Sequence, residues 1–255
     1  MPPDGHANGT LLRVATWNIH GGVGRDRRYD VERIVAVLRE IDADIVGLQE
    51  VASLELHGEF LRELKRGTGC DVVCGPTLSR RGSDFGNALL ARHQVRRVTH
   101  LDLALPRCEP RAAIDVILDI AGASFRVLVT HLGLRPYERR EQVQRILDVM
   151  EQEGELPTVL MGDVNEWYLW GRPLRWLHAH FGSPRARATF PSIAPLLALD
   201  RIWVQPVRCL QRLRVHRSTL ARTASDHLPL VADIVVECTD GALRRALPTD
   251  AHAPA

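Results

Sequence analysis

The amino-acid sequence predicts an α+β fold built in layers, and three observations indicate this class. Short apolar runs rich in Val, Ile and Leu recur along the chain, as is typical of buried strands. Few segments have the spacing of an amphipathic helix. Hairpin connections, such as the turn at residues 119–125, alternate with longer segments that allow strand crossovers. Many strands, few helices and both kinds of connection indicate sheets covered by helices.

The chain opens with a strand, a loop, a helix and a second strand. Leu11–Trp17 and Asp44–Gln49 are the two strand-like runs. Between them, Asp30 can cap a helix, because apolar residues follow it at intervals of three and four. Pro136 opens another helix with an apolar stripe. The remaining strands are expected at residues 71–74, 86–91, 95–103, 112–120, 125–131, 158–161, 200–204, 208–215 and 230–236.

A single domain is expected over residues 11–238. The chain has 255 residues, of which 45% are hydrophobic, and this is enough to bury a sizeable core. No polar linker divides it. Residues 1–10 and 239–255 contain proline and few large apolar side chains, so we expect flexible tails there.

The cysteines and the N-terminus bear on localisation. The five cysteines show no paired spacing, which favours a reducing compartment. The N-terminus lacks the basic and apolar regions of a signal peptide, and no uncharged apolar run is long enough to span a membrane. We therefore expect a cytoplasmic protein with no stable membrane insertion. Nothing in the sequence indicates an obligate protein partner.

The charges nearly balance, with 33 Lys and Arg against 31 Asp and Glu and a net charge of +2. A dedicated nucleic-acid binder is usually strongly basic, and this chain is not. An acidic substrate would have to be attracted by a local patch.

Polar residues stand where several predicted strands end or begin. A strand end is rigid and opens onto a cleft, so it can present catalytic groups and ligands accurately. Each residue taken singly has a structural explanation, such as a turn or a cap. Their number in one chain favours a functional site. The set is Asn18, Glu50, His131, Asp163, Asn165, Asp200, Asp226 and His227.

This ordered set resembles the endonuclease/exonuclease/phosphatase superfamily, from about Leu11 to Val236. The resemblance implies a four-layer α/β sandwich, in which two mixed β-sheets pack face to face with helices outside and the active site lies at one edge of the sheets. It also implies hydrolysis of a phosphate ester. The motifs that carry it are Trp17-Asn18, Gln49-Glu50, Thr130-His131-Leu132, Gly162-Asp163-Val164-Asn165, Leu199-Asp200-Arg201-Ile202 and Ser225-Asp226-His227.

The chemistry of phosphate-ester hydrolysis gives these residues expected roles. The reaction needs neutralised charge on the phosphoryl oxygens, an activated water and a stabilised leaving oxygen. A Mg²⁺ or Mn²⁺ ion held by carboxylates serves the first need. Glu50 is the first choice as metal ligand, Asp226 is a second candidate, and Asn18 lies adjacent.

Two residues compete for the role of general base. His227 can take a proton from water if a carboxylate fixes its tautomer, and the resemblance gives Asp200 as that partner. Asp163 is the other candidate, and the sequence does not decide between them. Asn165 is expected to hold the nucleophile or to donate to a phosphate oxygen.

His131 and Arg111 are expected to contact the phosphate. His131 resembles the histidine of the deoxyribonuclease and sphingomyelinase branches, and it would donate to a phosphoryl or leaving oxygen. The abasic-site endonuclease branch is disfavoured, because it has a Tyr-containing segment there and a Trp-rich segment where this chain has residues 188–192. Arg111 is either a bidentate phosphate ligand or an exposed arginine at a strand start.

The substrate is predicted less closely than the reaction. A small or lipid-derived phosphodiester is the leading expectation. Aromatic residues at Trp167–Trp170 can form a wall for a lipid or a platform for a base, although packing against the following helix is the preferred interpretation. A DNA or RNA nuclease is the alternative, supported by arginine pairs at 80–81, 96–97 and 139–140 and by the run 208–217. A non-catalytic phosphate-binding module is a third possibility, disfavoured because no catalytic residue is lost.

Overall fold

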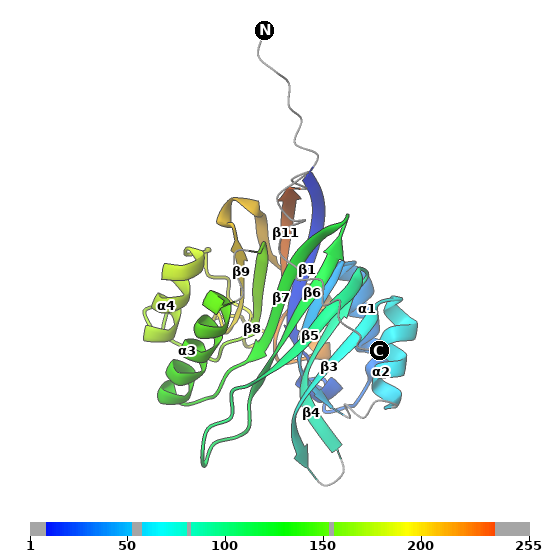
Figure 1. The fold of residues 1–255 in the computed structure, drawn as a ribbon. Helices are drawn as coiled ribbons and strands as arrows, with labels where there is room; N and C mark the ends of the chain where they lie inside the picture. Colours follow the sequence, from blue (N-terminus) through cyan, green and yellow to red (C-terminus); the bar gives the residue numbers. More distant parts are fainter. Residues whose placement is uncertain (1–8, 53–57, 81–82, 153–155, 238–255) are drawn as a thin grey trace, which may run out of the picture.

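The computed structural model describes residues 9–52, 58–80, 83–152 and 156–237. Two mixed β-sheets pack face to face, with α1 and α2 outside one sheet and α3 and α4 outside the other (Figure 1). This is the four-layer sandwich that the sequence predicts. Most of the predicted tails, residues 1–8 and 239–255, lies outside the described residues, and the first strand already begins at Gly9.

The six-stranded sheet has the order β10-β11-β1-β2-β4-β3. Strands β1 and β2 run parallel, and their partners on either side are antiparallel. Alternate side chains of β1 point to opposite faces of this sheet. One set packs against the five-stranded sheet and the other packs against the helices, so β1 contributes to the core on each side. The strands are β1 (Gly9–Asn18), β2 (Ile45–Ala52), β3 (Asp71–Arg80), β4 (Ser83–Ala91), β10 (Leu210–Val215) and β11 (Leu230–Glu237).

The five-stranded sheet has the order β5-β6-β7-β8-β9. Here β7 and β8 form the parallel pair, because α3 connects them as a crossover, while hairpins and loops make the other pairs antiparallel. The predicted hairpin at residues 119–125 joins β6 to β7 as expected. The strands are β5 (Gln94–Asp102), β6 (Ala112–Ile120), β7 (Ala123–His131), β8 (Thr158–Asp163) and β9 (Asp200–Gln205).

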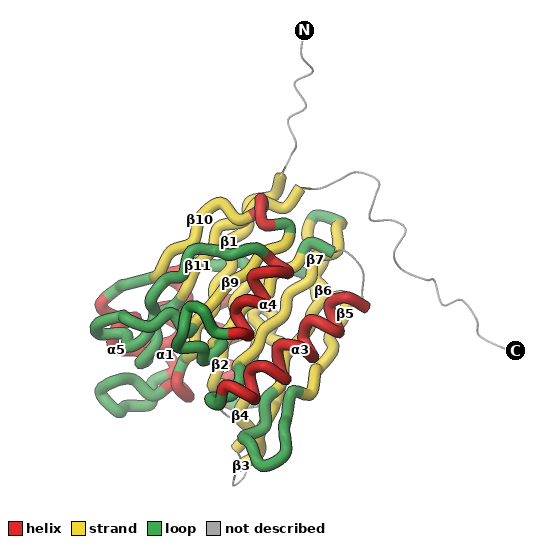
Figure 2. The backbone as a smooth tube through the Cα atoms, turned by 90° about the vertical axis from the view of Figure 1, so that its left-hand side faces the viewer, coloured by secondary structure: helices red, strands yellow, loops and turns green. Residues whose placement is uncertain are grey.

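The helices cover the outer faces, and Figure 2 shows α3 and α4 lying side by side on the five-stranded sheet. Asp30 caps α1 as predicted, since its side chain accepts the backbone N–H of Arg33 at 2.9 Å. No helix in the described ranges is long and apolar enough to cross a bilayer. The helices are α1 (Val31–Ile41), α2 (Glu59–Thr68), α3 (Pro136–Gln152), α4 (Arg172–Phe181) and α5 (Thr219–Ala224), with single 3₁₀ turns η1 (His20–Gly22) and η2 (Val207–Cys209).

The core between the sheets positions the site. Buried aliphatic residues of both sheets, including Val14, Leu89, Val129 and Ile234, interdigitate there. Strand β1 contacts β8, and β2 contacts both β7 and β8. The carboxyl ends of both parallel pairs therefore meet at one edge of the sandwich.

Candidate active site

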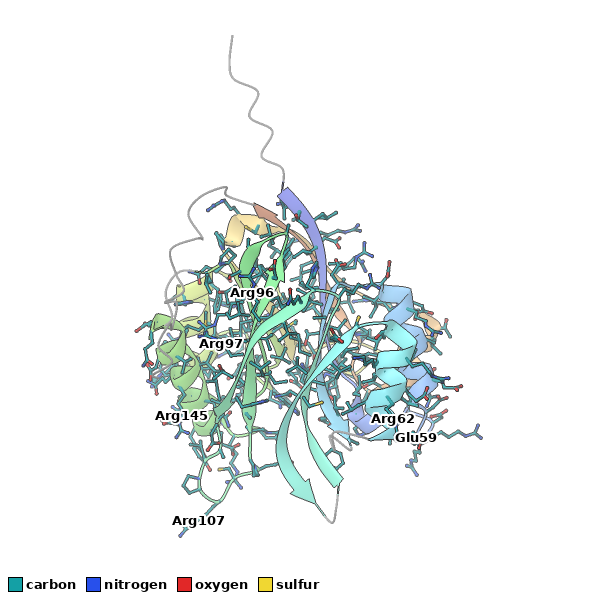
Figure 3. The ribbon with its side chains drawn as sticks, turned by 45° about the vertical axis from the view of Figure 1, so that its right-hand side comes forward. Glu59, Arg62, Arg96, Arg97, Arg107 and Arg145 are labelled. Carbon is teal, nitrogen blue, oxygen red and sulfur yellow. The ribbon has the colours of Figure 1, made fainter. Side chains whose placement is uncertain are left out.

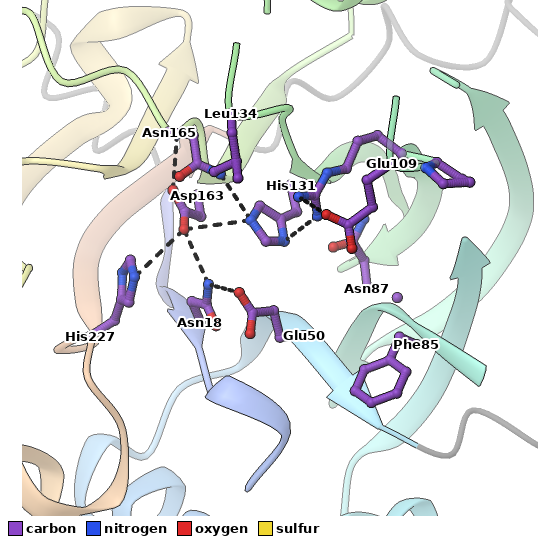
Figure 4. Close-up of a pocket in the computed structure, with 13 residues that line it drawn as sticks. Asn18, Glu50, Phe85, Asn87, Glu109, His131, Leu134, Asp163, Asn165 and His227 are labelled. Carbon is purple, nitrogen blue, oxygen red and sulfur yellow. Dashed lines mark hydrogen bonds and ion pairs between the residues drawn. The ribbon is translucent and has the colours of Figure 1, made fainter. Parts of the chain in front are cut away.

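Asp163, the last residue of β8, lies at the centre of this edge and lines a cavity of about 320 Å³ (Figure 4). Its Oδ2 accepts a hydrogen bond from Nδ2 of Asn18 at 3.1 Å. The same oxygen lies 3.7 Å from Nε2 of His131 and 3.7 Å from Nε2 of His227. Its Oδ1 accepts the backbone N–H of Asn165 at 2.9 Å. One buried carboxylate is thus shared among groups from four separate segments.

The backbone next to Asp163 is constrained. Gly162 has a φ of 150°, and a Cβ there would lie 1.9 Å from the carbonyl oxygen of Thr130. Asn165 has a φ of 50°, a left-handed conformation that asparagine tolerates better than most residues. Its Nδ2 donates to the carbonyl oxygen of Leu132 at 2.9 Å. The glycine lets β8 approach β7 closely, and this brings Asp163 level with His131.

A β-bulge in β2 aims Glu50 into the cavity. The register against β4 shifts between Leu48 and Val51, so residues 49 and 50 together stand opposite Asn87. Glu50 has a φ of 55°, which is rare for a side chain of this size and marks a position held by its surroundings. Its Oε1 accepts from Nδ2 of Asn18 at 2.9 Å. Asn18 therefore bridges the carboxylates of Glu50 and Asp163.

His227 is held from behind by Asp200 at the start of β9. Nδ1 of His227 lies 2.8 Å from Oδ2 of Asp200, and this oxygen also accepts from Oγ1 of Thr189 at 2.5 Å. Burial lowers the pKa of His227, but the carboxylates of Asp200 and Asp163 outweigh that effect and raise the pKa to about 10. Without a metal, the ring is an imidazolium at neutral pH, with Nε2 directed toward Asp163.

His131 has the opposite environment. Its Nδ1 lies 3.1 Å from Nη1 of Arg111 and its Nε2 lies 3.0 Å from Nδ2 of Asn165, so N–H donors face both ring nitrogens. Burial and the Arg111 charge lower the pKa of His131 to about 3, despite the nearby Asp163. The two histidines beside one carboxylate therefore differ in charge at neutral pH.

The donor set fits a hard divalent cation. Glu50 is half-buried at the cavity wall and Asp163 is beside it, so carboxylate oxygens, the ligands that Mg²⁺ and Mn²⁺ prefer, face a polar cavity. Atoms of Asp163, Asp200 and His227 also lie within 4.8 Å of one another and form a second candidate set. We favour the first, because His227 and Thr189 already hold Oδ2 of Asp200.

The predicted residues do not all reach the cavity. Asp226 is not part of the cavity wall. Its Oδ1 instead accepts from Ser225, whose hydroxyl also donates to the carbonyl oxygen of Asn18. Asp200 lies behind His227. The predicted residues that line the cavity are Asn18, Glu50, Arg111, His131, Asp163, Asn165 and His227.

The structure adds residues that the sequence pattern did not single out. Asn87 of β4 is 1% exposed, donates to the carbonyl oxygen of Ala112 and leaves its Oδ1 without a protein partner at the cavity. A polar residue inside an apolar strand run was the available signal. Glu109 lines the cavity and pairs with Arg111 at 3.0 Å. Thr189 supports Asp200, a long-range contact with no local signature.

The aromatic loop after Asn165 does not pack as expected. Packing of Trp167, Tyr168 and Trp170 against the following helix was the preferred interpretation. Instead these side chains are 59%, 58% and 73% exposed. The loop is anchored by Glu166, and its aromatic rings face solvent.

The four-layer fold and the carboxylates and imidazoles at its edge are those of a class of phosphoester hydrolases, and the comparison with known families agrees. A model of the Endonuclease/Exonuclease/phosphatase family matches residues 15–227. The chain belongs to this family. Membership implies metal-dependent hydrolysis of phosphoesters, with the substrate left open.

Individual relatives are similar along most of their length. The uncharacterized protein YbhP of Escherichia coli (strain K12) is 29% identical over 250 residues, which cover 88% of this chain and 96% of that protein. An endonuclease/exonuclease/phosphatase of Beutenbergia cavernae superposes with a TM-score of 0.72 at 25% identity, covering 89% of this chain and 72% of the other. The mannosyl-6-phosphatase of Bacteroides thetaiotaomicron has a TM-score of 0.71 at 20% identity, covering 88% and 99%, and this likeness concerns the fold.

Proposed function

We propose that this chain is a metal-dependent phosphodiesterase that hydrolyses a small or lipid-derived phosphodiester. The observation that carries the proposal is the position of Asp163, whose Oδ2 lies 3.7 Å from Nε2 of both His131 and His227. A carboxylate between two imidazoles, one charged and one neutral, can accept a proton from water beside a phosphate that the rings hold.

Glu50 is the proposed metal ligand, oriented by its hydrogen bond from Asn18. A Mg²⁺ or Mn²⁺ ion bound there supplies positive charge that offsets the charge on the phosphoryl and leaving oxygens. Asn18 presents Nδ2 to both carboxylates, so we propose that it positions Glu50 and Asp163.

Asp163 is the proposed general base. The raised pKa of His227, about 10, favours an imidazolium that donates from Nε2 to a phosphoryl oxygen over a ring that accepts a proton. Asp200 fixes the tautomer by accepting from Nδ1. In this assignment Asp163 accepts the proton from water and His227 donates to a phosphoryl oxygen, so both candidates for the general base have a role.

The opposite wall is proposed to bind the phosphate. Arg111 lines the cavity, and its Nε is buried without a protein partner. His131, kept neutral by its lowered pKa, and Asn165 line the same side of the cavity, and the ring of His131 lies against the Arg111 guanidinium. Guanidinium and amide donors bind phosphoryl oxygens without competing for the proton of the nucleophile.

A nuclease remains the second candidate, because one observation favours it. Arg187, Arg212, Arg214 and Arg217 line a common concavity along β10, remote from the aromatic loop in sequence. Such a cluster can bind a phosphate backbone. Among the other arginines expected to have this role, Arg139 is buried in an ion pair with Glu166 and Arg96 pairs with Asp119, while the side chains of the pair at 80–81 lie outside the described part of the chain. Figure 3 shows Arg96 and Arg97, the arginine pair on β5, on the same side of the molecule as Arg107 and Arg145.

The test is hydrolysis with Mg²⁺ or Mn²⁺ across phospholipids, inositol phosphates, bis(p-nitrophenyl) phosphate, plasmid DNA and RNA. We expect turnover of a small or lipid phosphodiester and none by Glu50→Gln. Hydrolysis of nucleic acid alone would replace the proposal with the nuclease. No hydrolysis of any substrate, together with retained phosphate binding, would point to a binding module.

A further inference from the structure

Four large apolar side chains stand exposed in the loop between β8 and α4. Trp167, Tyr168, Leu169 and Trp170 are 59%, 58%, 57% and 73% exposed. The ring centroids of Tyr168 and Trp170 lie 5.5 Å apart, so these two rings interact, and residues 167–170 together are called the ridge below. Single exposed apolar residues are ordinary on protein surfaces, but a contiguous set beside a cavity marks an interaction surface.

A buried ion pair holds this loop beside the cavity. Nε of Arg139 in α3 lies 3.1 Å from Oε2 of Glu166, and their side chains are only 3% and 4% exposed. Glu166 accepts the backbone N–H of Tyr168. Arg139 also donates to the carbonyl oxygens of Gly133 and Leu134. The aromatic loop and the segment at Leu134 are thus fastened to the same two side chains.

Leu134 links the exposed surface to the catalytic cavity. Its side chain is 65% exposed and also forms part of the cavity wall, near His131 (Figure 4). Tyr137, three residues further on in the first turn of α3, is 46% exposed. Leu134 and Tyr137 therefore expose apolar surface next to the cavity, on a segment that the Arg139–Glu166 pair also fastens to the aromatic loop.

The charge of the two segments is one-sided. Among residues 134–137 and 167–175, the exposed charged side chains are Arg135, Arg172 and Arg175, and neither segment has an exposed carboxylate. Glu138 and Glu166, next to these segments, are buried. Tyrosine and tryptophan favour the boundary between water and hydrocarbon, and arginine attracts anionic headgroups.

We propose that Leu134, Tyr137 and residues 167–170, flanked by Arg172 and Arg175, form an interfacial surface that docks the cavity onto a bilayer containing anionic phospholipid. The inference rests on the proposed function, because a docked bilayer would supply the lipid phosphodiester directly to the cavity. The surface favours lipid over nucleic acid, because Leu134 and Leu169 can enter the acyl boundary but cannot stack on bases.

The test is flotation of the purified full chain with vesicles of phosphatidylcholine, with or without phosphatidylglycerol, in EDTA. We expect binding to the anionic vesicles, reduced about tenfold or more in Trp167→Ala/Trp170→Ala, because each buried ring contributes to insertion. Arg172→Gln/Arg175→Gln should weaken binding to the anionic vesicles only. The matched control is Leu11→Ala/Val207→Ala, which removes side chains 66% and 55% exposed at the opposite end of the sheets.

Three results would overturn the docking surface. They are failure of the wild type to float with the anionic vesicles, equal flotation of the double tryptophan variant, and flotation lost equally in the control. Loss of single-stranded oligonucleotide binding in the tryptophan variant, without vesicle binding in the wild type, would assign the ridge to bases. Glu50→Gln should float like the wild type, because this substitution leaves the docking surface unchanged. If the wild type floats with the vesicles but hydrolyses no diester, the docking surface stands and only the proposed function is refuted.

Discussion

Oδ2 of Asp200 lies 2.8 Å from Nδ1 of His227, and the two side chains are only 0% and 7% exposed. Thr189 donates to the same oxygen, while Oδ1 of Asp200 has no protein partner. Burial works against the charged ring, but the nearby carboxylates of Asp200, Asp163 and Asp226 overcome it and hold the pKa of His227 near 10. The folded, metal-free protein therefore contains a buried ion pair between the His227 imidazolium and the Asp200 carboxylate. This ion pair affects both stability and activity.

The first consequence is an alkaline loss of stability in the metal-free protein. Because the pKa of His227 in the folded chain, about 10, exceeds its ordinary value of 6.5, the unfolded chain releases this proton first. The stabilisation is complete below about pH 6.5 and is lost as the pH rises through 10. Each unit of pKa difference corresponds to about 1.4 kcal/mol. Urea unfolding in EDTA between pH 6 and 10 should show the wild type losing more stability than His227→Asn.

His131 provides the matched control for this measurement. Its pKa is lowered to about 3 in the folded chain, so its contribution is present above pH 6.5 and is lost as the pH falls toward 3. His131→Gln should therefore flatten the acid limb of the stability profile and leave the alkaline limb intact. An alkaline limb that disappears in both variants, or in neither, would contradict the separate charge states of the two rings.

The second prediction concerns proton transfer. Removing the proposed base in Asp163→Asn should lower kcat by about 10²–10⁴-fold, a range typical of lost general base catalysis. Single-turnover kinetics at saturating metal would measure it, with circular dichroism to check the fold. Asp148→Asn, on the exposed face of α3, is the control and should keep kcat near that of the wild type. Near-normal turnover by Asp163→Asn would remove Asp163 from the role of base.

The third prediction concerns the metal. Glu50 reaches the cavity only through the bulge in β2, so Glu50→Gln keeps the shape and loses the charge that binds a cation. Mn²⁺ affinity measured by calorimetry should fall by more than about 10-fold. Removal of a residue that only orients a metal ligand can already cause a loss of that size, and Glu50 is proposed to bind the metal directly. Activity should disappear in EDTA and return with Mg²⁺ or Mn²⁺. Full activity after exhaustive dialysis against EDTA would contradict metal dependence.

Much of the candidate site follows from the sequence because strand ends are local features. Glu50, His131 and Asp163 end or closely follow apolar runs, and parallel pairing of β1 with β2 and of β7 with β8 brings such ends to one edge. The boundaries of β6, Ala112–Ile120, are as expected, whereas β3 continues to Arg80 rather than ending at residue 74 and β2 continues past Gln49 to Ala52. The cap of α1 by Asp30 is equally local.

Contacts between distant segments could not be predicted in the same way. Asn87 reaches the cavity because β4 lies antiparallel to β2 across a bulge, and neither pairing nor bulge has a pattern in one sequence. Thr189 meets Asp200 through a long irregular loop. Helix α2 was not expected from the sequence, although Phe60, Leu61 and Leu64 form a buried apolar stripe on this otherwise charged helix. Arg139 was grouped with surface arginines, and its buried pairing with Glu166 depends on tertiary packing.

The last prediction separates the two candidate substrate classes by their salt dependence. An enzyme that tracks a nucleic-acid backbone makes many phosphate contacts, and its affinity falls steeply as counterions compete. An enzyme for a small or lipid diester makes one or two such contacts, here through Arg111 and its neighbours at the cavity. The net charge of +2 and the burial of Arg139 both favour the second behaviour.

The measurement is kcat/KM on plasmid DNA and on a chromogenic diester across a salt series. We expect weak or no cleavage of DNA and a shallow salt response with the small diester. The matched variant is Arg212→Gln/Arg214→Gln, which removes charge from the concavity on β10 without touching the catalytic cavity. If DNA is cleaved efficiently with a steep log–log slope, and this variant reduces that slope by about one unit for each lost phosphate contact, the β10 concavity is a backbone-binding groove and the chain is a nuclease. The assignments of Glu50, Asp163 and His227 would stand under that result, because both substrates present the same scissile phosphate to the cavity.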